Sequence, residues 1–151
     1  MPQQRADALF VLEDDPDDLA FIRRAVTRAR ISNPLAVRTS VSHARSYFER
    51  LDGSTAPALC IVDVYLPDGE SGIDFLRWLR AQPAPIGSLP VMVYTVSMDA
   101  AHVTEAERLG GVRFVRKPVT EGTLTHAVLA LGFVITSTTA ERGAERRIAR
   151  R

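Results

Sequence analysis

Lysine is almost absent from this sequence, although basic residues are common. Of its 19 basic residues, only Lys117 is a lysine, and a proline follows it directly. The ammonium group of lysine is a compact point charge, whereas the guanidinium group of arginine is a wide planar fork, so the two do not substitute for each other at a tight anion site. Lys117 is therefore a candidate for such a site, although a single lysine can also survive by chance.

Other absences exclude whole classes of protein. Cys60 is the single cysteine and lies in an apolar run, which excludes a disulfide framework and favours a reducing compartment. The net charge of +1 gives no bulk field for nucleic acid or for an anionic membrane. No apolar run has transmembrane length and no signal-like segment opens the chain. We therefore expect a cytoplasmic protein that binds neither nucleic acid nor membrane.

Length and composition predict one domain with a short tail. The chain has 151 residues, of which 46% are hydrophobic and 25% are charged, enough to form a core without help. We expect the domain over residues 1–136 and a basic, mobile C-terminal tail over residues 137–151. The apolar segment 132–136 is either a cap on its own domain or a homodimer contact. The basic run 142–151 is either a solvated end or a docking segment for an acidic partner.

The apolar pattern alternates between the period of a strand and that of a helix. Strand-like runs cover residues 8–12, 35–39, 58–62, 90–95 and 112–115. Helical patterns start at Pro16 and at about residues 42, 73, 99 and 121. This order predicts an α/β fold with a parallel sheet and helices on both faces.

The first helix has a clear start and a clear stop signal. Pro16 suits a first helical turn, and Asp15 is suited to cap it. Asp17 and Asp18 complement the helix dipole. The Asn33-Pro34 pair is expected to stop the helix.

Polar residues follow the predicted strands where ligands bind in such a sheet, at the carboxyl ends. Glu13 and Asp14 follow the first strand, Asp63 follows the third, and Lys117 follows the fifth. Several carboxylates on one rim repel each other, so a cation is needed among them. Mg²⁺ is the expected ion because it prefers oxygen ligands. Thr95, at the end of the fourth strand, adds a neutral hydroxyl.

Each of these residues also has a purely structural interpretation. Acids after a strand often cap the next helix, which is the favoured role of Asp15, Asp17 and Asp18. Asp63 alone is as often a loop acid, and Thr95 alone is usually structural. The prediction depends on their joint occurrence at successive strand ends. The three histidines have no ligand-like spacing, so a histidine metal site is not expected.

Four stretches, LFVLEDDPDD, ALCIVDVYLPDGESG, LPVMVYT and VRFVRKP, resemble the receiver domain of two-component response regulators in order and spacing. The resemblance covers about residues 7–131. It implies a flavodoxin-like, doubly wound (βα)5 fold of the CheY type. Such a protein is a phosphoacceptor switch, not an enzyme in the usual sense, and takes its phosphoryl group from a histidine kinase or phosphotransfer protein.

The resemblance also implies roles for single residues. Asp63 matches the phosphoacceptor and Asp14 the direct Mg²⁺ ligand. Glu13 matches the second acid, which commonly acts through water. The backbone carbonyl of Tyr65 takes the place of a further metal ligand.

The remaining matched residues belong to a conformational switch. Thr95 matches the switch hydroxyl and Phe114 the rotating aromatic residue. Lys117 matches the lysine that contacts the phosphoryl group, and Pro118 the proline that usually follows it through a cis bond. Output is then expected through protein contacts, including a possible homodimer of the kind found among small regulators paired with phytochrome-type kinases.

Departures and rivals limit these expectations. The spacing from Pro67 to Gly72 is one residue longer than usual in the family, and Glu13 and Phe114 replace the commoner Asp and Tyr. A haloacid-dehalogenase phosphatase would need an acid where Tyr65 stands, and a dinucleotide binder would need a Gly-rich turn after the first strand. A receiver that serves only as an interaction module, with little phosphotransfer, remains the alternative.

Overall fold

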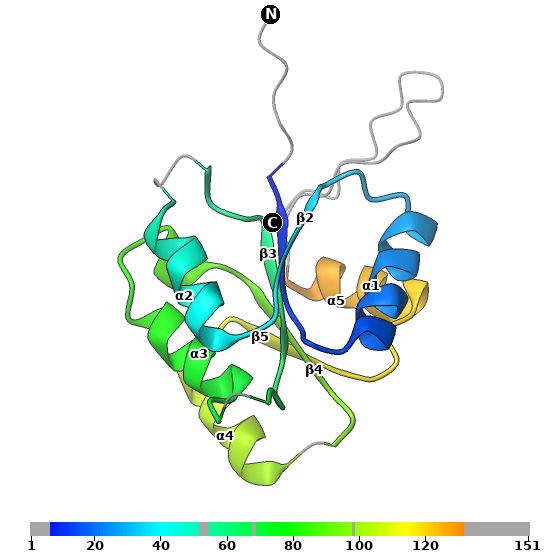
Figure 1. Ribbon diagram of the computed structural model, residues 1–151. Helices are drawn as coiled ribbons and strands as arrows, with labels where there is room; N and C mark the ends of the chain where they lie inside the picture. The colour runs from blue at the N-terminus through cyan, green and yellow to red at the C-terminus, as the bar shows by residue number, and fades with distance from the viewer. Residues whose placement is uncertain (1–6, 52–54, 68, 98, 132–151) are drawn as a thin grey trace, which may run out of the picture.

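The protein is described from a computed structural model that defines residues 7–51, 55–67, 69–97 and 99–131. A five-stranded parallel sheet has the strand order β2-β1-β3-β4-β5, with helices on both sides (Figure 1). The predicted α/β fold, flavodoxin-like and doubly wound, is confirmed. The elements are β1 (Leu9–Leu12), α1 (Pro16–Arg28), β2 (Leu35–Arg38), α2 (Val41–Glu49), β3 (Leu59–Asp63), α3 (Gly72–Arg80), the short 3-10 helix η2 (Ile86–Ser88), β4 (Val91–Thr95), α4 (Ala100–Leu109), β5 (Val112–Arg116) and α5 (Glu121–Leu131).

The helices form two layers around the sheet. Helices α1 and α5 lie on one face, and α2, α3 and α4 lie on the other (Figure 1). Each face has its own apolar core, because alternate side chains of a strand point to opposite sides. Leu9 and Val11 of β1 pack toward α1 and α5, whereas Phe10 and Leu12 pack into the other core. The central strands are buried on both faces, which explains their continuous apolar runs.

Helix α1 begins as predicted but ends early. The side chain of Asp15 accepts hydrogen bonds from the backbone N–H groups of Asp17 and Asp18, and Pro16 occupies the first turn. The helix ends at Arg28, several residues before the Asn33-Pro34 stop signal. The reason is a turn that the sequence pattern did not show: the next residues leave the helix with Arg30 in the left-handed region, at φ 58°.

The start of α3 lies against the end of β3. Gly72 donates its backbone N–H to the carbonyl of Val64 at 2.9 Å, and a Cβ at Gly72 would collide with the backbone carbonyl oxygen of Asp63. Ser71 and Asp74 form a reciprocal capping box at this helix start. The longer loop before it contains Gly69, whose φ of 82° favours glycine. This loop therefore brings a helix start, without a side chain in the way, up to the backbone of Asp63.

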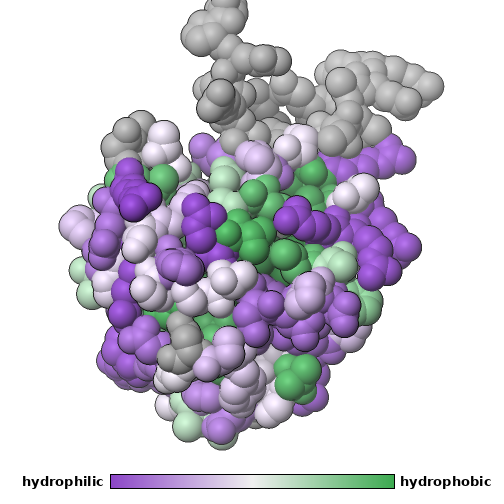
Figure 2. All heavy atoms as spheres, in the orientation of Figure 1, coloured by the Kyte–Doolittle hydropathy of each residue, from purple (hydrophilic) through white to green (hydrophobic). Residues whose placement is uncertain are grey.

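Edge strand β2 and the two chain ends are less enclosed than the central strands or lie outside the described residues. The side chains of edge strand β2 are half-buried, and Figure 2 shows an apolar area between α1 and α2, where this strand lies. No helix among the described residues is both long enough and apolar enough to cross a membrane. The predicted domain end, the apolar segment 132–136 and the basic tail 137–151 lie outside the described residues.

Candidate functional site

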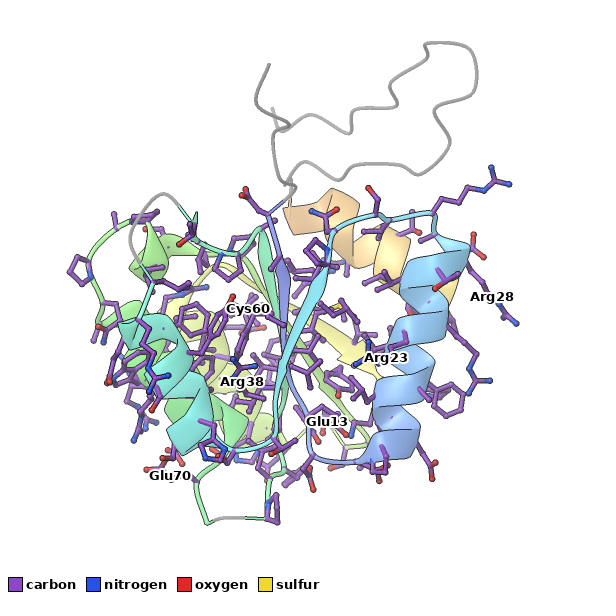
Figure 3. The ribbon with its side chains drawn as sticks, turned by 45° about the horizontal axis from the view of Figure 1, so that its top comes forward. Glu13, Arg23, Arg28, Arg38, Cys60 and Glu70 are labelled. Atoms are coloured by element: carbon purple, nitrogen blue, oxygen red, sulfur yellow. The ribbon has the colours of Figure 1, made fainter. Side chains whose placement is uncertain are left out.

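The carboxyl edge of the sheet gathers buried polar side chains. Glu13 directly follows β1, and Asp63 and Thr95 are the last residues of β3 and β4. All three are buried, with exposed fractions of 1%, 3% and 2%. Figure 3 shows Glu13 at the end of β1, close to the start of α1. Burial of this kind is costly for charged groups unless they are paired, so the site needs a counter-charge.

Lys117 supplies a counter-charge from the end of β5. Its Nζ lies 3.0 Å from Asp63 Oδ2, 2.6 Å from Asp18 Oδ2 and 3.5 Å from Glu13 Oε1. Burial opposes the charged form of this ammonium, but its hydrogen bonds to Asp18 and Asp63 outweigh that effect and raise its pKa. Lys117 therefore stays protonated and joins carboxylates from β1, α1 and β3 at one point.

Glu13 is the acid of this group whose ionisation is opposed by burial. Burial raises the pKa of this carboxyl to about 9, and a hydrogen bond to Asp63 adds to the rise. The carboxyl of Glu13 therefore keeps its proton to a higher pH than an exposed glutamate does. Glu13 Oε2 is buried and has no hydrogen-bond partner of acceptable geometry in the described part of the chain. A buried carboxylate oxygen without a partner is an incomplete site.

A divalent cation fits this arrangement. Glu13, Asp14 and Asp63 each offer a carboxylate oxygen, and these atoms lie within 4.8 Å of one another. Asp14 is exposed, so the group opens to solvent on one side. Hard cations such as Mg²⁺ take carboxylate oxygens and keep several waters, which suits a half-open acidic site. The oxygen of Glu13 without a partner is the observation that favours a cation here.

The residues predicted to act in the switch, and Tyr65 beside them, each have contacts in the structure. The Thr95 hydroxyl donates to the carbonyl of Ser97 at 2.9 Å, so it turns toward its own loop and not toward Asp63. Tyr65 donates its backbone N–H to Asp63 Oδ1 at 3.3 Å, and its ring is 46% exposed against His102. Phe114 is half-buried on the side of α2, α3 and α4. The Lys117-Pro118 bond is cis, as expected.

Two residues of the site were missed in the sequence. Asp18 was assigned to the helix dipole, yet it makes the shortest ion pair of Lys117. Its spacing could have shown this, because Asp18, Ile22 and Ala25 follow the buried stripe of α1. Tyr94 is buried, and Lys117 Nζ lies 4.9 Å from its ring centre. The apolar pattern alone marked Tyr94 only as a core residue.

Comparison with known proteins agrees with this geometry. The family description "Response regulator receiver domain" matches residues 9–129, which is most of the chain. The chain belongs to this family. The resemblance seen in the four sequence stretches is confirmed, and this receiver extends from β1 into α5.

Relatives of this receiver differ in length. The transcriptional regulatory protein FixJ of Bradyrhizobium diazoefficiens is 30% identical over 118 residues, which are 78% of this chain and 52% of FixJ. The chain thus spans about half the length of this curated relative. The receiver resemblance therefore concerns one part of FixJ and carries no activity of its other part.

Solved structures support the fold. The bacteriophytochrome response regulator RtBRR is 28% identical, with a TM-score of 0.74 over 84% of this chain and 78% of RtBRR. The Mn²⁺-bound form of response regulator Rcp1 is 18% identical, with a TM-score of 0.66 over 80% of this chain and 88% of Rcp1. At this identity the second likeness shows the fold alone.

Proposed function

We propose that this receiver works in a two-component phosphorelay and that Asp63 accepts the phosphoryl group. The donor is a histidine kinase or a phosphotransfer protein, and the protein works in the cytoplasm. One observation carries the proposal: the buried Asp63 carboxylate lies against Lys117 at 3.0 Å, beside two further acids that can hold a cation.

The chemistry needs little more than position and charge. A carboxylate oxygen of Asp63 attacks phosphorus, a P–O bond forms, and the bond to the donor nitrogen breaks with its electron pair going to that nitrogen. The product carries about two negative charges where the carboxylate carried one. Lys117, already paired with Asp63 Oδ2, compensates the added charge. Residues of this chain therefore promote its own modification, which is the role of a switch and not of an enzyme with free substrates.

The cation belongs to the same proposal. Glu13, Asp14, Asp63 and the backbone carbonyl of Tyr65 would hold Mg²⁺, and the ion would supply positive charge to the acids and to the phosphoryl oxygens. The orphaned oxygen of Glu13 supports this assignment. The Mn²⁺-bound form of Rcp1 supports it only as an analogy of fold.

The response would start at Thr95. Its hydroxyl would exchange the carbonyl of Ser97 for a phosphoryl oxygen, and Phe114 would then repack into the space that is left. The change would reach the surface of α4, β5 and α5, where protein partners read it. The likeness to RtBRR favours a place among regulators paired with phytochrome-type kinases, which often dimerise.

A direct test uses Asp63→Asn. Wild-type protein incubated with acetyl phosphate and Mg²⁺ should gain a phosphoryl group in intact-protein mass spectrometry, and Asp63→Asn should not. Glu49→Gln, an exposed acid at the end of α2, is the matched control and should behave like the wild type. Equal uptake by Asp63→Asn would refute the assignment.

The second candidate is the interaction module without phosphotransfer. It would be favoured if the wild type took up no phosphoryl group from acetyl phosphate or from a histidine kinase, and if Mg²⁺-dependent binding of beryllofluoride were also absent. The buried group of acids and its lysine then would have no ligand, which is why we rank this candidate second.

A further inference from the structure

The hydroxyl of Tyr94 is a buried polar group that the proposed function does not use. Tyr94 lies in β4, directly before Thr95, and is 1% exposed. Its hydroxyl oxygen has no hydrogen-bond partner of acceptable geometry among the described residues. An unsatisfied hydroxyl inside a protein lowers its stability, and phenylalanine would avoid this loss. The hydroxyl therefore calls for a partner that the packing of the core does not supply.

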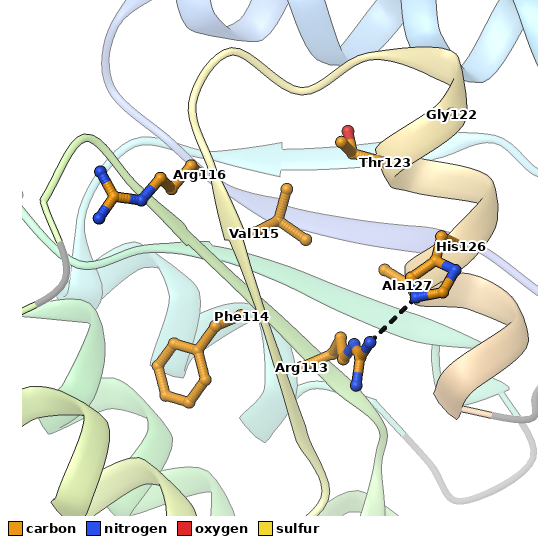
Figure 4. A pocket seen from close by; sticks show the side chains of 8 residues that line it. All are labelled: Arg113, Phe114, Val115, Arg116, Gly122, Thr123, His126 and Ala127. Atoms are coloured by element: carbon orange, nitrogen blue, oxygen red, sulfur yellow. Dashed lines mark hydrogen bonds between the residues drawn. The ribbon is translucent and has the colours of Figure 1, made fainter.

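Tyr94 points to the same face of the sheet as the acidic group. It is paired in register with Asp63 of β3 and with Val115 of β5. Figure 4 shows Val115 on the side of β5 that faces α5, and Tyr94 packs into the same apolar core. Val11 of β1 belongs to this core too. Because side chains alternate along a strand, Glu13, two residues after Val11, faces this side as well.

Tyr94 and Glu13 share one ammonium group. Lys117 Nζ lies 4.9 Å from the centre of the Tyr94 ring and 3.5 Å from Glu13 Oε1. Both residues thus contact the same cation, which places the tyrosine beside the glutamate. Burial raises the pKa of the Tyr94 hydroxyl, and the negative charge of Glu13 adds to the rise. The hydroxyl therefore keeps its proton and is a donor next to an acid.

Glu13 carries the matching acceptor. Its Oε2 is buried and lacks a hydrogen-bond partner within the part of the chain that the structure describes. Burial raises the pKa of the Glu13 carboxyl to about 9, whereas the Tyr94 hydroxyl lowers it by more than the charge of Lys117 does. The hydroxyl and the carboxyl are therefore close, although they do not face each other in hydrogen-bond geometry. A carboxylate has about four acceptor positions, so Glu13 can accept from Tyr94 and still hold a cation.

We propose that Tyr94 is a positioning residue of the acidic site, whose hydroxyl donates a hydrogen bond to the Glu13 carboxylate and holds it for the cation. The inference rests on the Mg²⁺ site of the proposed function. Groups that hydrogen-bond to a metal ligand typically change metal affinity by about 10- to 100-fold. The hydrogen bond forms when the carboxylate takes up the cation. It therefore contributes to the affinity for Mg²⁺ and not to the stability of the protein in EDTA.

The test is Tyr94→Phe in the full-length protein, with thermal unfolding measured in EDTA and over a series of Mg²⁺ concentrations. Phenylalanine keeps the ring beside Lys117 and removes only the hydroxyl. The dissociation constant of Mg²⁺, obtained from the rise in melting temperature, should increase about tenfold. In EDTA the melting temperature should equal or exceed that of the wild type, because no hydrogen bond is lost there.

Tyr47→Phe is the matched control. Tyr47 is a half-buried tyrosine of α2 that packs against the other core, with its ring stacked on Phe10 at 5.0 Å between centres. The substitution removes the same hydroxyl away from the acidic group. It should leave the dissociation constant of Mg²⁺ unchanged.

Phosphorylation by acetyl phosphate gives a second measurement. In Tyr94→Phe the Mg²⁺ concentration that supports half of the maximal rate should rise about tenfold. The rate at saturating Mg²⁺ should equal that of the wild type, because the hydroxyl acts through Glu13 and does not touch the phosphoryl group. A residue that only packs the core would change neither quantity.

Four results would overturn the proposal. Equal dissociation constants of Mg²⁺ in Tyr94→Phe and the wild type would show that the hydroxyl does not hold Glu13. An equal loss of affinity in Tyr47→Phe would show that the effect is not specific to this site. A lower saturating rate with an unchanged half-saturating Mg²⁺ concentration would place the effect on the phosphoryl group. If the wild type itself gained no stability from Mg²⁺, the cation site of the proposed function would fail, and this inference with it.

Discussion

Two partly buried cations hold opposite ends of the same sheet, and their surroundings differ in kind. Lys117 sits at the carboxyl edge among Asp63, Asp18 and Glu13, which are all acids. Arg80 sits at the amino edge, at the end of α3, and donates only to backbone carbonyls. Those carbonyls belong to Gly87, Leu89, Gly110 and Gly111, in the segments that lead into β4 and β5.

The difference separates a structural site from a functional one. Burial lowers the pKa of Arg80, but its fork meets carbonyls that are neutral and fixed, so every contact is made within the chain. At the other edge, acids outnumber the one ammonium, and Glu13 Oε2 has no hydrogen-bond partner among the described residues. The contacts of Arg80 are thus made within the chain, whereas the carboxyl edge keeps an unpaired oxygen, as expected of a site that takes a ligand.

The largest expected effect on stability comes from removing the contacts of Arg80 at the amino edge. Arg80→Ala should lower the free energy of unfolding by about 3 kcal/mol, because four carbonyls lose a charged donor that closes two loops. Urea denaturation measures this change. Arg50→Ala, which removes an exposed arginine, should change the same quantity by less than about 0.5 kcal/mol.

Equal losses in these two variants would show that the contacts of Arg80 add nothing beyond charge. Arg80→Lys refines the result. It keeps the charge but replaces the fork by a single ammonium, which cannot reach carbonyls on both loops. We expect it to recover less than half of the stability lost in Arg80→Ala.

The stability of the protein should instead depend on Mg²⁺ through the acidic group at the carboxyl edge. Mg²⁺ at a hundredfold excess over its dissociation constant should stabilise the wild type by about 2.7 kcal/mol, since it binds only the folded site. Asp14→Asn removes the exposed carboxylate of the acidic group and should abolish most of this gain. Thermal unfolding with Mg²⁺ and then with EDTA measures it. Arg80→Ala should keep the full gain, and its loss there would contradict the separation of the two ends.

The two ends also differ in how well the sequence predicted them. The carboxyl edge was predictable because strands of a parallel sheet end on one side, so Glu13, Asp63 and Lys117 had to meet there. The contacts of Arg80 were not predictable, because its partners are backbone carbonyls, and every residue type carries one. Carbonyl partners leave no pattern in the sequence.

Similar reasons explain the smaller errors. Strand bounds and helix starts were within one or two residues. The end of α1 was not, because Arg30 turns the chain before the expected Asn33-Pro34 stop. The spacing places Asp18 on the buried stripe of α1, but it does not name Lys117 as the partner. That pairing depends on tertiary packing, as does the contact between Tyr94 and Lys117.

A smaller effect should follow from filling the contact between α3 and β3. Gly72→Ala places a Cβ against the backbone carbonyl of Asp63 and should cost about 2 kcal/mol of folding free energy. Gly122→Ala is the matched control in α5, where the new Cβ meets nothing closer than 3.9 Å. That variant should be neutral or slightly stabilising, because alanine favours a helix over glycine. Urea denaturation compares the two, and equal stability would show that β3 can shift to make room.

The smallest effect is expected from the surface ion pairs of Glu105 with Arg77 and Arg108. Arg108 and then Arg77 hold the pKa of Glu105 at about 2, below its usual value of 4.5. A lowered pKa in the folded state contributes stability above pH 4.5 and loses it as the pH falls toward 2. The stability difference between the wild type and Glu105→Gln should therefore be small at neutral pH and vanish over that range.

Salt should shrink the same difference, since exposed charges are screened. Urea denaturation at a series of pH values and salt concentrations measures both trends. Arg80→Ala should show neither trend, because its carbonyl partners carry no charge and do not titrate. A salt-sensitive loss in Arg80→Ala, or a salt-insensitive one in Glu105→Gln, would mean that exposure does not separate the two kinds of contact.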